Sequence, residues 1–361
     1  MKITLNTIEI QEVIKKAQKA IPKKPSLKIL SNVKISALND KITLTVTDID
    51  TTIFFDLTGY IADQGEILLN PETLKLIAKL KNTYEITIEN NKITAGNKVL
   101  KYSNQDPEEY PKMEYDCDNQ AFTISQKNLI DAFSVSYCSG YEMNIPIFCG
   151  VYINKDHFVA TDTHRLAWKK VDIENTMEQG VVINNNAVKL LTGTLLNKKS
   201  DTIVTVKYDK GYKHIKFQSD NITIITRLIE GQYLNYKQVI PKQHKTAIKI
   251  NVQNILDELE FINEICKKNH GITFAVDKNN MYIDAADDRN AVTLTIPCLE
   301  MIGEEIECMG IDYIFLVDAL KNCEQEELEI KFNDKYNPIL FSNNSLVCPL
   351  RVDESIEEVI L

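Results

Sequence analysis

Hydrophobic and polar positions along the chain repeat three times in the same order. Each repeat opens with a short run that alternates apolar and polar residues. A polar residue follows, and then apolar residues recur at the spacing of an amphipathic helix. These runs begin at Lys2, Ala121 and Ala247. The pattern therefore predicts a strand followed by a helix at the start of three successive units.

Two more features follow in each unit. A second strand-to-helix run contains, in the first unit, Asn70 and Pro71, which fit an N-cap and the first helical position. This run covers residues 66–80, 181–195 and 306–320. Between the two predicted helices, a strand, an acidic turn and another strand cover residues 41–57, 157–173 and 281–296. Later strand-like runs with Asn, Asp and Gly at their centres predict hairpins.

Three features in one order are a stronger sign of triplication than any single match. We therefore predict an α+β fold of three repeated domains, each with two helices packed on antiparallel sheets of roughly eight strands in all. The predicted domains are residues 1–120, 121–245 and 246–361, the last boundary following Pro241 and the polar run KQHK.

Composition adds limits to this prediction. Hydrophobic residues make up 44% of the 361 and charged residues 25%, which is ordinary for a globular protein. The first residues lack the apolar run of a signal peptide, and no stretch approaches the roughly 18 apolar residues of a membrane span. We expect a cytoplasmic protein without a membrane partner. The eight cysteines show no CxxC spacing, so we expect free thiols and neither a metal nor a cofactor.

The net charge of −10 argues against nucleic-acid binding, unless the positive charge gathers on one surface. Many lysines lie on or just after the repeated helices, and equivalent helices would line one surface. The simpler interpretation is a solvated helix face. The candidate lysines are Lys15, Lys16, Lys19, Lys24, Lys75, Lys79, Lys81, Lys189, Lys198, Lys199, Lys267 and Lys268.

The string around Asp162 and His164 is the most enzyme-like part of the chain. An acid and a histidine two residues apart suggest an acid–base pair or two ligands of a metal-assisted hydrolase. The corresponding turns keep an acid at Asp48 and Asp287 but have no histidine. The alternative is that all three carboxylates accept hydrogen bonds from backbone N–H groups in equivalent turns.

Four strings together resemble the bacterial DNA polymerase III beta subunit, the beta sliding clamp. They are VATDTHRLA from Val159, TRLIEGQYLNYKQVIP from Thr226, PSLKIL from Pro25 and VCPLRV from Val347. The resemblance runs from the first strand to about Val352. It implies a non-enzymatic, ring-shaped homodimer whose helices line a positively charged channel around duplex DNA. It also implies as partners the replicative DNA polymerase, the clamp loader and other proteins with clamp-binding peptides.

The resemblance implies a hydrophobic pocket for those peptides between the second and third domains. The matching positions are Phe148, Thr161, Thr163, His164, Arg165, Leu166, Leu234, Val239, Asp312, Phe315, Leu346, Cys348, Pro349, Leu350 and Arg351. For the contact between protomers, domain one to domain three, we expect Tyr110 together with Ile262 or Ile265.

Several positions depart from the family pattern. Thr163 replaces a glycine, Leu234 replaces a proline, and the loop from Tyr141 to Gly150 lacks the usual polar or basic residues. A tail, DESIEEVIL, follows the last motif; it is either a frayed acidic terminus or a segment that competes for the pocket. These departures leave open a clamp-like scaffold that binds partners but no longer encircles DNA.

Overall fold

The computed structural model describes residues 1–351, except residues 104, 142–143 and 268–269, and it leaves the side chains of residues 194–195 undescribed. The described chain forms two compact units. Unit 1 contains residues 1–133, 152–156 and 171–230, and unit 2 contains residues 134–151, 157–170 and those from 231 onward. Part of the predicted central domain therefore packs with the third domain. The acidic tail lies outside the described residues.

Unit 1 contains two antiparallel sheets. The first has the order β5 (Gly59–Asp63), β1 (Lys2–Asn6), β7 (Glu85–Glu89), β8 (Lys92–Ala95) and β9 (Lys98–Lys101). The second has the order β6 (Gly65–Leu69), β2 (Val33–Leu38), β3 (Lys41–Thr47), β4 (Thr51–Leu57), β17 (Ile222–Ile229), β16 (His214–Ser219), β15 (Ile203–Tyr208) and β10 (Asn119–Ser125). Strand β14 (Val181–Asn184) also pairs with β17.

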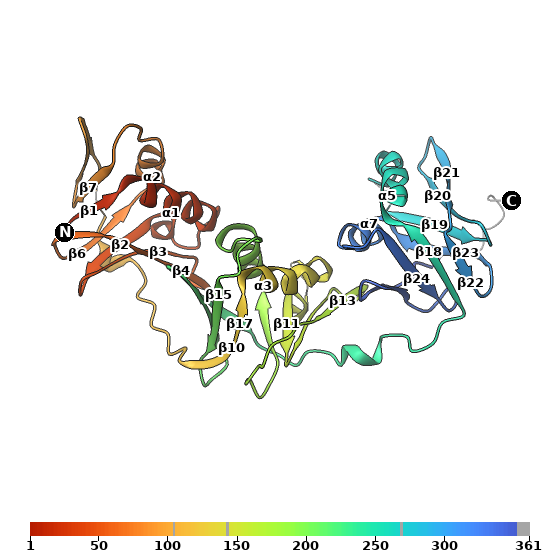
Figure 1. The fold of residues 1–361 in the computed structure, drawn as a ribbon. Coiled ribbons are helices and arrows are strands. Elements are labelled where there is room, and N and C mark those ends of the chain that lie inside the picture. Colours follow the sequence, from red (N-terminus) through yellow and green to blue (C-terminus); the bar gives the residue numbers. More distant parts are fainter. Residues whose placement is uncertain (104, 142–143, 268–269, 352–361) are drawn as a thin grey trace. The chain divides into compact units, whose positions relative to one another are not determined.

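The helices of unit 1 are α1 (Thr7–Ala20), α2 (Pro71–Ala78), α3 (Gln126–Ala132) and α4 (Asn185–Leu190), which continues as a π-helical turn over Leu191–Leu195. Short 3₁₀ turns cover Lys28–Ser31 and Pro107–Glu109. Helices α1 and α2 lie next to each other (Figure 1). The Gln11 side chain joins them by donating to the carbonyl oxygens of Ile77 and Leu80, at 2.9 Å each.

Unit 2 also contains two antiparallel sheets. The first has the order β22 (Glu300–Ile302), β18 (Thr246–Asn251), β24 (Glu327–Phe332), β25 (Ile339–Phe341), β26 (Ser345–Val347), β13 (Arg165–Lys170) and β12 (His157–Thr161). The second has the order β21 (Ala291–Pro297), β20 (Asn280–Ala286), β19 (Gly271–Val276) and β23 (Ile306–Asp312). Strand β11 (Gly150–Asn154) contains the point at which the chain passes from unit 2 to unit 1.

The helices of unit 2 are α5 (Val252–Phe261), α6 (Asn263–Cys266) and α7 (Tyr313–Lys321). Three short 3₁₀ turns cover Phe133–Cys138, whose first residue belongs to unit 1, Pro146–Phe148 and Tyr236–Gln238. In Figure 1, α5 and α7 lie on the same side of strands β18 and β24.

The six helices that follow a strand all begin in the same way, which confirms the predicted repeat. The residue at each junction, which is the last of the strand or, before α2, the one after it, stays extended. Its side-chain oxygen accepts a hydrogen bond from a backbone N–H in the first helical turn. These N-cap residues are Asn6, Asn70, Ser125, Asn184, Asn251 and Asp312. The alternating strand and its polar last residue are therefore enough to place each helix start.

Two predicted helices are shorter than their sequence patterns suggested. In the second domain the α-helix ends at Ala132, and the chain continues as a 3₁₀ turn. Ser134, Val135 and Ser136 follow, and serine and β-branched residues are weak helix formers. In the third domain the helix breaks at Ile262, between α5 and α6.

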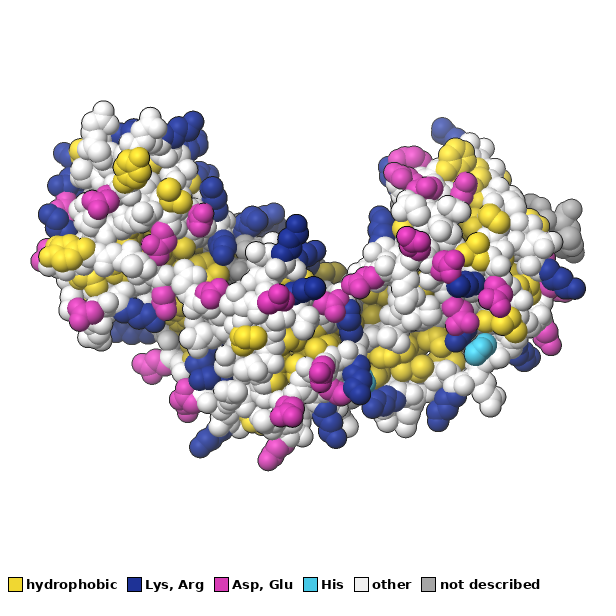
Figure 2. Space-filling model, viewed as in Figure 1, with side chains coloured by type: hydrophobic (Ala, Val, Ile, Leu, Met, Phe, Trp, Pro, Cys, Tyr) yellow, Lys and Arg dark blue, Asp and Glu magenta, His cyan; other side chains and the backbone are white. Residues whose placement is uncertain are grey.

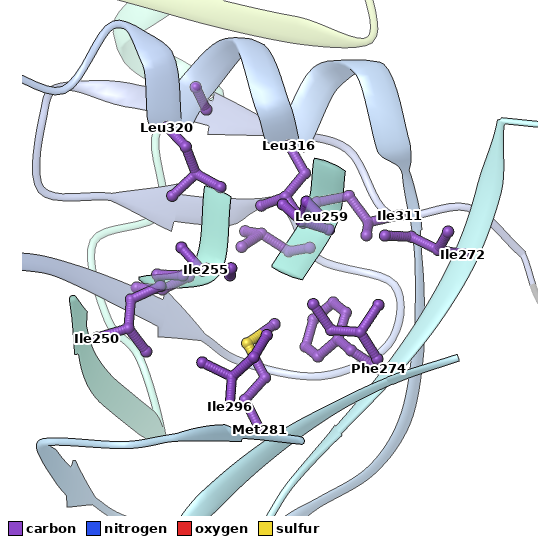
Figure 3. Close-up of a cluster of buried hydrophobic side chains, with 14 of the residues drawn as sticks. Ile250, Ile255, Leu259, Ile272, Phe274, Met281, Ile296, Ile311, Leu316 and Leu320 are labelled. Carbon is purple, nitrogen blue, oxygen red and sulfur yellow. The ribbon is translucent and has the colours of Figure 1, made fainter. Parts of the chain in front are cut away.

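The core of unit 2 explains why helices α5 and α7 each have one apolar face. Ile255 and Leu259 of α5 pack with Leu316 and Leu320 of α7 over the inward side chains of the strands, such as Phe274 (Figure 3). Full burial of one such side chain stabilises a fold by about 1.5–3 kcal/mol. The helices are thus held by their shared layer of side chains.

All eight cysteines are free thiols, as predicted; three are buried and five are half-buried. Burial raises the pKa of the Cys138 thiol far above its ordinary value. Within the described residues, no helix is both long enough and apolar enough to cross a membrane.

Candidate functional site

Three equivalent turns carry the acids noted in the sequence. The Asp162 carboxylate accepts from the N–H groups of His164 and Arg165 at 3.0 and 2.9 Å. Asp48 accepts from the N–H of Thr51 at 2.7 Å, in the same position of its own turn. Asp287 accepts from the N–H groups of the residues two and three positions later, at 2.8 and 2.7 Å. The interpretation of these acids as turn-forming residues is therefore confirmed.

The turn that contains Asp162 has an unusual backbone. Thr163 has a φ of +77°, and Ile49, its counterpart in unit 1, has a φ of +84°. A β-branched residue rarely adopts this left-handed conformation, because its Cβ crowds the backbone. The N–H of Thr163 donates to the Thr161 hydroxyl at 3.1 Å, which holds the turn in place. Glycine at this position would avoid this strain, and threonine does not.

The hydrolase hypothesis gains no support from this geometry. The Asp162 carboxylate is engaged by two backbone N–H groups and by Arg165. The exposed His164 ring stacks on Phe315 with 6.4 Å between the ring centres. Among the residues that the structure describes, no group of three or more His, Cys, Asp or Glu is placed to hold a metal ion.

Arg165 links this turn to helix α7. Its Nε donates to Asp162 Oδ2 at 2.8 Å, and its NH1 donates to Asp318 Oδ2 at 2.6 Å. The guanidinium lies 4.4 Å from the centre of the Phe315 ring, within the range of a cation–π interaction. The side chain is only 10% exposed. Arg165 is therefore held by charge and packing inside unit 2.

Strand pairing brings the end of the third domain to the same turn. Leu166 lies opposite Leu346, and Arg165 lies opposite Val347, where β13 pairs with β26. The chain then continues along the turn, since the N–H of Cys348 donates to the His164 carbonyl at 2.7 Å. Leu350 forms a bridge with Gly310, just before α7. Residues from three distant parts of the sequence thus meet in one place.

The structure brings most of the predicted pocket together at this place. Direct contacts or strand neighbours connect Thr161, Thr163, His164, Arg165, Leu166, Phe315, Leu346, Cys348 and Leu350. Asp312 caps the start of α7, while Pro349 and Arg351 lie on either side of Leu350. Hydrophobic side chains gather on the surface of unit 2 below α7 (Figure 2). Burial raises the pKa of the Cys348 thiol, with a smaller contribution from Asp162.

The remaining predicted pocket residues lie on the segment that leads into the third domain and on the turn packed against it. Phe148 contacts Tyr233 edge to face at 5.7 Å between ring centres. Leu234 is half-buried, and Val239 is exposed at the end of the Tyr236–Gln238 turn. These residues belong to unit 2, as the Arg165 turn does.

The candidate lysines lie where the repeated helices were expected. On α1, Lys15 and Lys19 are exposed and Lys16 is half-buried; Lys75 is exposed on α2 and Lys189 on α4. The exposed residues beyond the helix ends are Lys24, Lys79, Lys81, Lys198, Lys199 and Lys267. Lys267 forms an ion pair with Glu264, and Lys268 lies outside the described residues. On the face shown in Figure 2, basic and acidic side chains are interspersed.

The residues expected at the contact between protomers need correction. Tyr110 is 1% exposed and packs with Leu30 and Leu68, while Ile262 is 0% exposed in the core of unit 2. A side chain that the protomer already covers has no surface left to bury against another molecule, so neither residue is an interface contact. Ile265 is half-buried and keeps some surface.

Sequence reasoning missed two residues at the Arg165 site. Asp318 is one of the two carboxylates that hold the guanidinium, and Tyr137 lies with its ring centre 6.0 Å from it. Both are far from Arg165 in the sequence. The acid was recognisable only as a charged residue within helix α7, whose other residues before Lys321 are hydrophobic.

Comparison with known proteins identifies the family. The chain matches the N-terminal domain of the DNA polymerase III beta subunit over residues 1–114, its central domain over 123–235 and its C-terminal domain over 237–360. The chain belongs to the DNA polymerase III beta subunit family. This family provides a processivity factor for DNA replication, without catalytic activity of its own.

Individual relatives agree over the whole length. The beta sliding clamp of Bacillus subtilis is 25% identical, covering 100% of this chain and 99% of the relative. The beta sliding clamp of Synechococcus elongatus is 24% identical, with 95% of each chain covered. The crystal structure of the Bacillus subtilis clamp matches with a TM-score of 0.88 at 22% identity, covering 98% of this chain and 100% of that one. The structural likeness shows that the fold is that of the family.

Proposed function

We propose that two copies of this chain close head to tail into a ring around duplex DNA and tether the replicative polymerase to it. Membership of the family supports a DNA sliding clamp, and nothing supports the scaffold or hydrolase alternatives. The domains proposed are those expected from the sequence, with boundaries at 120 and 245, close to the limits of the three family matches. A cytoplasmic location follows from the role in replication.

The observation that supports a ring is a strand pairing between successive repeats that occurs twice within the chain. We call this pairing the seam. In unit 1, β4, which follows the first acidic turn, pairs antiparallel with β17, the closing strand of the second domain. In unit 2, β13, which follows the second turn, pairs with β26, the closing strand of the third domain. In both cases, the strand that follows the acidic turn of one repeat pairs with the closing strand of the next repeat.

Within the described residues, the same pattern leaves one strand that follows an acidic turn and one closing strand without a partner of the other kind. Strand β21 follows the third acidic turn and is the end strand of its sheet, and β9 closes the first domain and is the end strand of its own. Pairing β21 with β9 of a second copy repeats the seam and satisfies two sheet edges. Lys98 and Lys101 of β9 and the acids Asp287 and Asp288 before β21 are complementary in charge.

A substitution on β9 tests this closure. Val99 is 61% exposed, so Val99→Asp leaves the protomer core intact while it places an acid opposite the acidic turn. We expect light scattering at micromolar concentration to give a dimer for the wild type and a monomer for the variant. The control is Tyr60→Asp on β5, the other end of the same sheet, where the residue is 70% exposed. A dimer that survives Val99→Asp contradicts the seam.

Binding to DNA is proposed to be topological and independent of base sequence. Lysines on and after the repeated helices would contact phosphates, which carry no sequence information. We expect retention on nicked circular duplex to persist at a salt concentration that releases the protein from linear duplex, since counterion release weakens only the electrostatic part. Equal loss from both substrates refutes the ring.

The pocket around the Arg165 turn is proposed to receive short peptides of the polymerase, the clamp loader and other partners. Exposed Val239 and Leu350 and the neighbouring apolar side chains offer the surface that an apolar peptide needs. Truncation of Val239 to Ala should cost about 1–3 kcal/mol of peptide affinity, measured by fluorescence anisotropy, and leave retention on circular DNA unchanged. Unchanged peptide affinity refutes this placement.

A further inference from the structure

The first helices of the first and third repeats can be matched residue by residue. Both follow an asparagine N-cap, Asn6 before α1 and Asn251 before α5, so positions are counted from the cap. Four buried residues of α1 then match four buried residues after Asn251: Thr7, Ile10, Ile14 and Ala17 match Val252, Ile255, Leu259 and Ile262. Because the buried faces agree, the exposed faces of the two helices are equivalent as well.

The charges on these equivalent exposed faces are opposite. Where α1 has Lys15, Lys16 and Lys19, the third repeat has Glu260, Phe261 and Glu264, all three exposed. Helices α5 and α6 contain no basic residue and four acidic ones, which are Asp257, Glu258, Glu260 and Glu264. The first base after them, Lys267, forms an ion pair with Glu264. The lysine face of α1 is thus replaced by an acidic face.

The second helix of the third repeat has also lost most of its positive charge. Lys75 of α2 and Lys189 of α4 both stand five positions after their N-caps, where α7 has the half-buried Val317. Lys79, nine positions after the cap of α2, does have a basic counterpart, Lys321. Of the five lysines within α1, α2 and their C-caps, the third repeat therefore keeps one.

The third repeat as a whole is strongly acidic. Residues 246–361 contain 23 of the chain's 51 acidic residues and 9 of its 41 basic residues, a net charge of −14. The net charge of the whole chain is −10, so residues 1–245 carry +4. Duplex DNA carries one negative charge per about 1.7 Å of its axis. It is therefore attracted by the first two repeats and repelled by the third.

We propose that duplex DNA inside the ring is held by the lysines of the first two repeats and is kept away from the third repeat by Glu260 and Glu264. This role rests on the ring of the proposed function and adds to it which part of the channel wall contacts DNA. The two glutamates set the position of the duplex by repulsion and do not touch it. In a ring of two chains, two basic arcs alternate with two acidic ones.

The test restores the lysines that α1 has at these positions. The full-length double variant Glu260→Lys with Glu264→Lys should bind a short fluorescein-labelled linear duplex about tenfold more tightly than the wild type at low salt, measured by fluorescence anisotropy. The plot of log affinity against log salt concentration should become steeper by about 0.9 for each new phosphate contact. Glu260→Gln with Glu264→Gln removes only the repulsion, so it should tighten binding by a smaller factor.

A matched control separates the position of the charges from their number. Glu304→Lys with Glu305→Lys makes the same change of charge at exposed residues between β22 and β23, and the affinity should stay within about twofold of the wild type. Light scattering checks that the variants are dimeric, and the Gln pair replaces the Lys pair if lysine weakens the dimer.

Two results overturn the proposal: an unchanged DNA affinity in the α5 variants, or an equal gain in the Glu304 and Glu305 control. Failure of the ring itself is recognised separately. If the wild type is lost equally from linear and nicked circular duplex, no ring encloses the DNA, and the division of its channel wall fails with it.

Discussion

Thr163 offers a direct measure of backbone strain at the peptide pocket. Its φ of +77° costs a residue other than glycine about 1–2 kcal/mol, and a β-branched side chain lies at the upper end. Glycine removes that cost but loses about 0.5–1 kcal/mol through the greater freedom of the unfolded chain. The side chain of Thr163 is exposed, so its removal forfeits little burial. Thr163→Gly should therefore stabilise unit 2 by about 1 kcal/mol.

The chain supplies its own probe for this measurement. Trp168 is the only tryptophan, and it lies on β13 of unit 2, where its backbone N–H donates to the Asn344 carbonyl oxygen at 3.0 Å. Its fluorescence reports the loss of the β13–β26 seam during urea unfolding. We expect the midpoint of this transition to rise in Thr163→Gly, and also in Thr163→Asn, since asparagine tolerates the left-handed region better than threonine.

The control is the same change in the equivalent turn of unit 1. Ile49→Gly relieves a φ of +84° there and should leave the Trp168 transition where it is, because that tryptophan belongs to unit 2. If Thr163→Gly leaves the midpoint unchanged or lowers it, the turn is not strained and the reasoning fails.

Three further predictions concern the same unit. Asp162→Ala removes the acceptor of two backbone N–H groups and one partner of Arg165, so the Trp168 transition should lose about 2–4 kcal/mol; a loss below about 0.5 kcal/mol contradicts the role of the turn. Cys138 is buried and its pKa is raised by that burial, so iodoacetamide at pH 8 should modify it only as the protein unfolds, which peptide mass spectrometry detects; rapid modification of the folded protein argues against the burial. Backbone N–H groups, first that of Asn279, lower the pKa of Asp277 from its ordinary value of 3.8, so this carboxylate stabilises the fold above that pH and the benefit is lost as the pH falls through the lowered pKa. The stability difference between the wild type and Asp277→Asn should therefore shrink on acidification, and a difference that grows contradicts the sign.

Much of the fold could be predicted because the information is local. An alternating strand that ends in Asn6, Asn184 or Asp312 specifies both the strand and the start of the helix after it, and the structure has each of them. Helix ends were harder to predict, because the break at Ile262 has no glycine or proline to mark it.

The candidate site was only partly predictable, since its contacts are long-range. The turn around Asp162 and the segment from Leu346 carry recognisable strings, and their pairing places them together. The ion pair between Arg165 and Asp318 joins residues 153 positions apart and has no local signal. The expected interface failed for another reason: Tyr110 is apolar and conspicuous, but hydrophobic residues usually fill the protomer's own core first.

The repeated seam has a consequence for how a closed ring would open. Inside the chain, the two strands of each seam are joined by covalent connections. If the two strands separate, each therefore meets the other at an effective concentration of the millimolar order, and the pairing re-forms at once. The seam between β21 and β9 of a second copy has the same kind of pairing but no tether. In a dimer closed in the proposed way, any force that pulls evenly on the ring therefore opens it at the junctions between chains. DNA would enter the ring through those junctions.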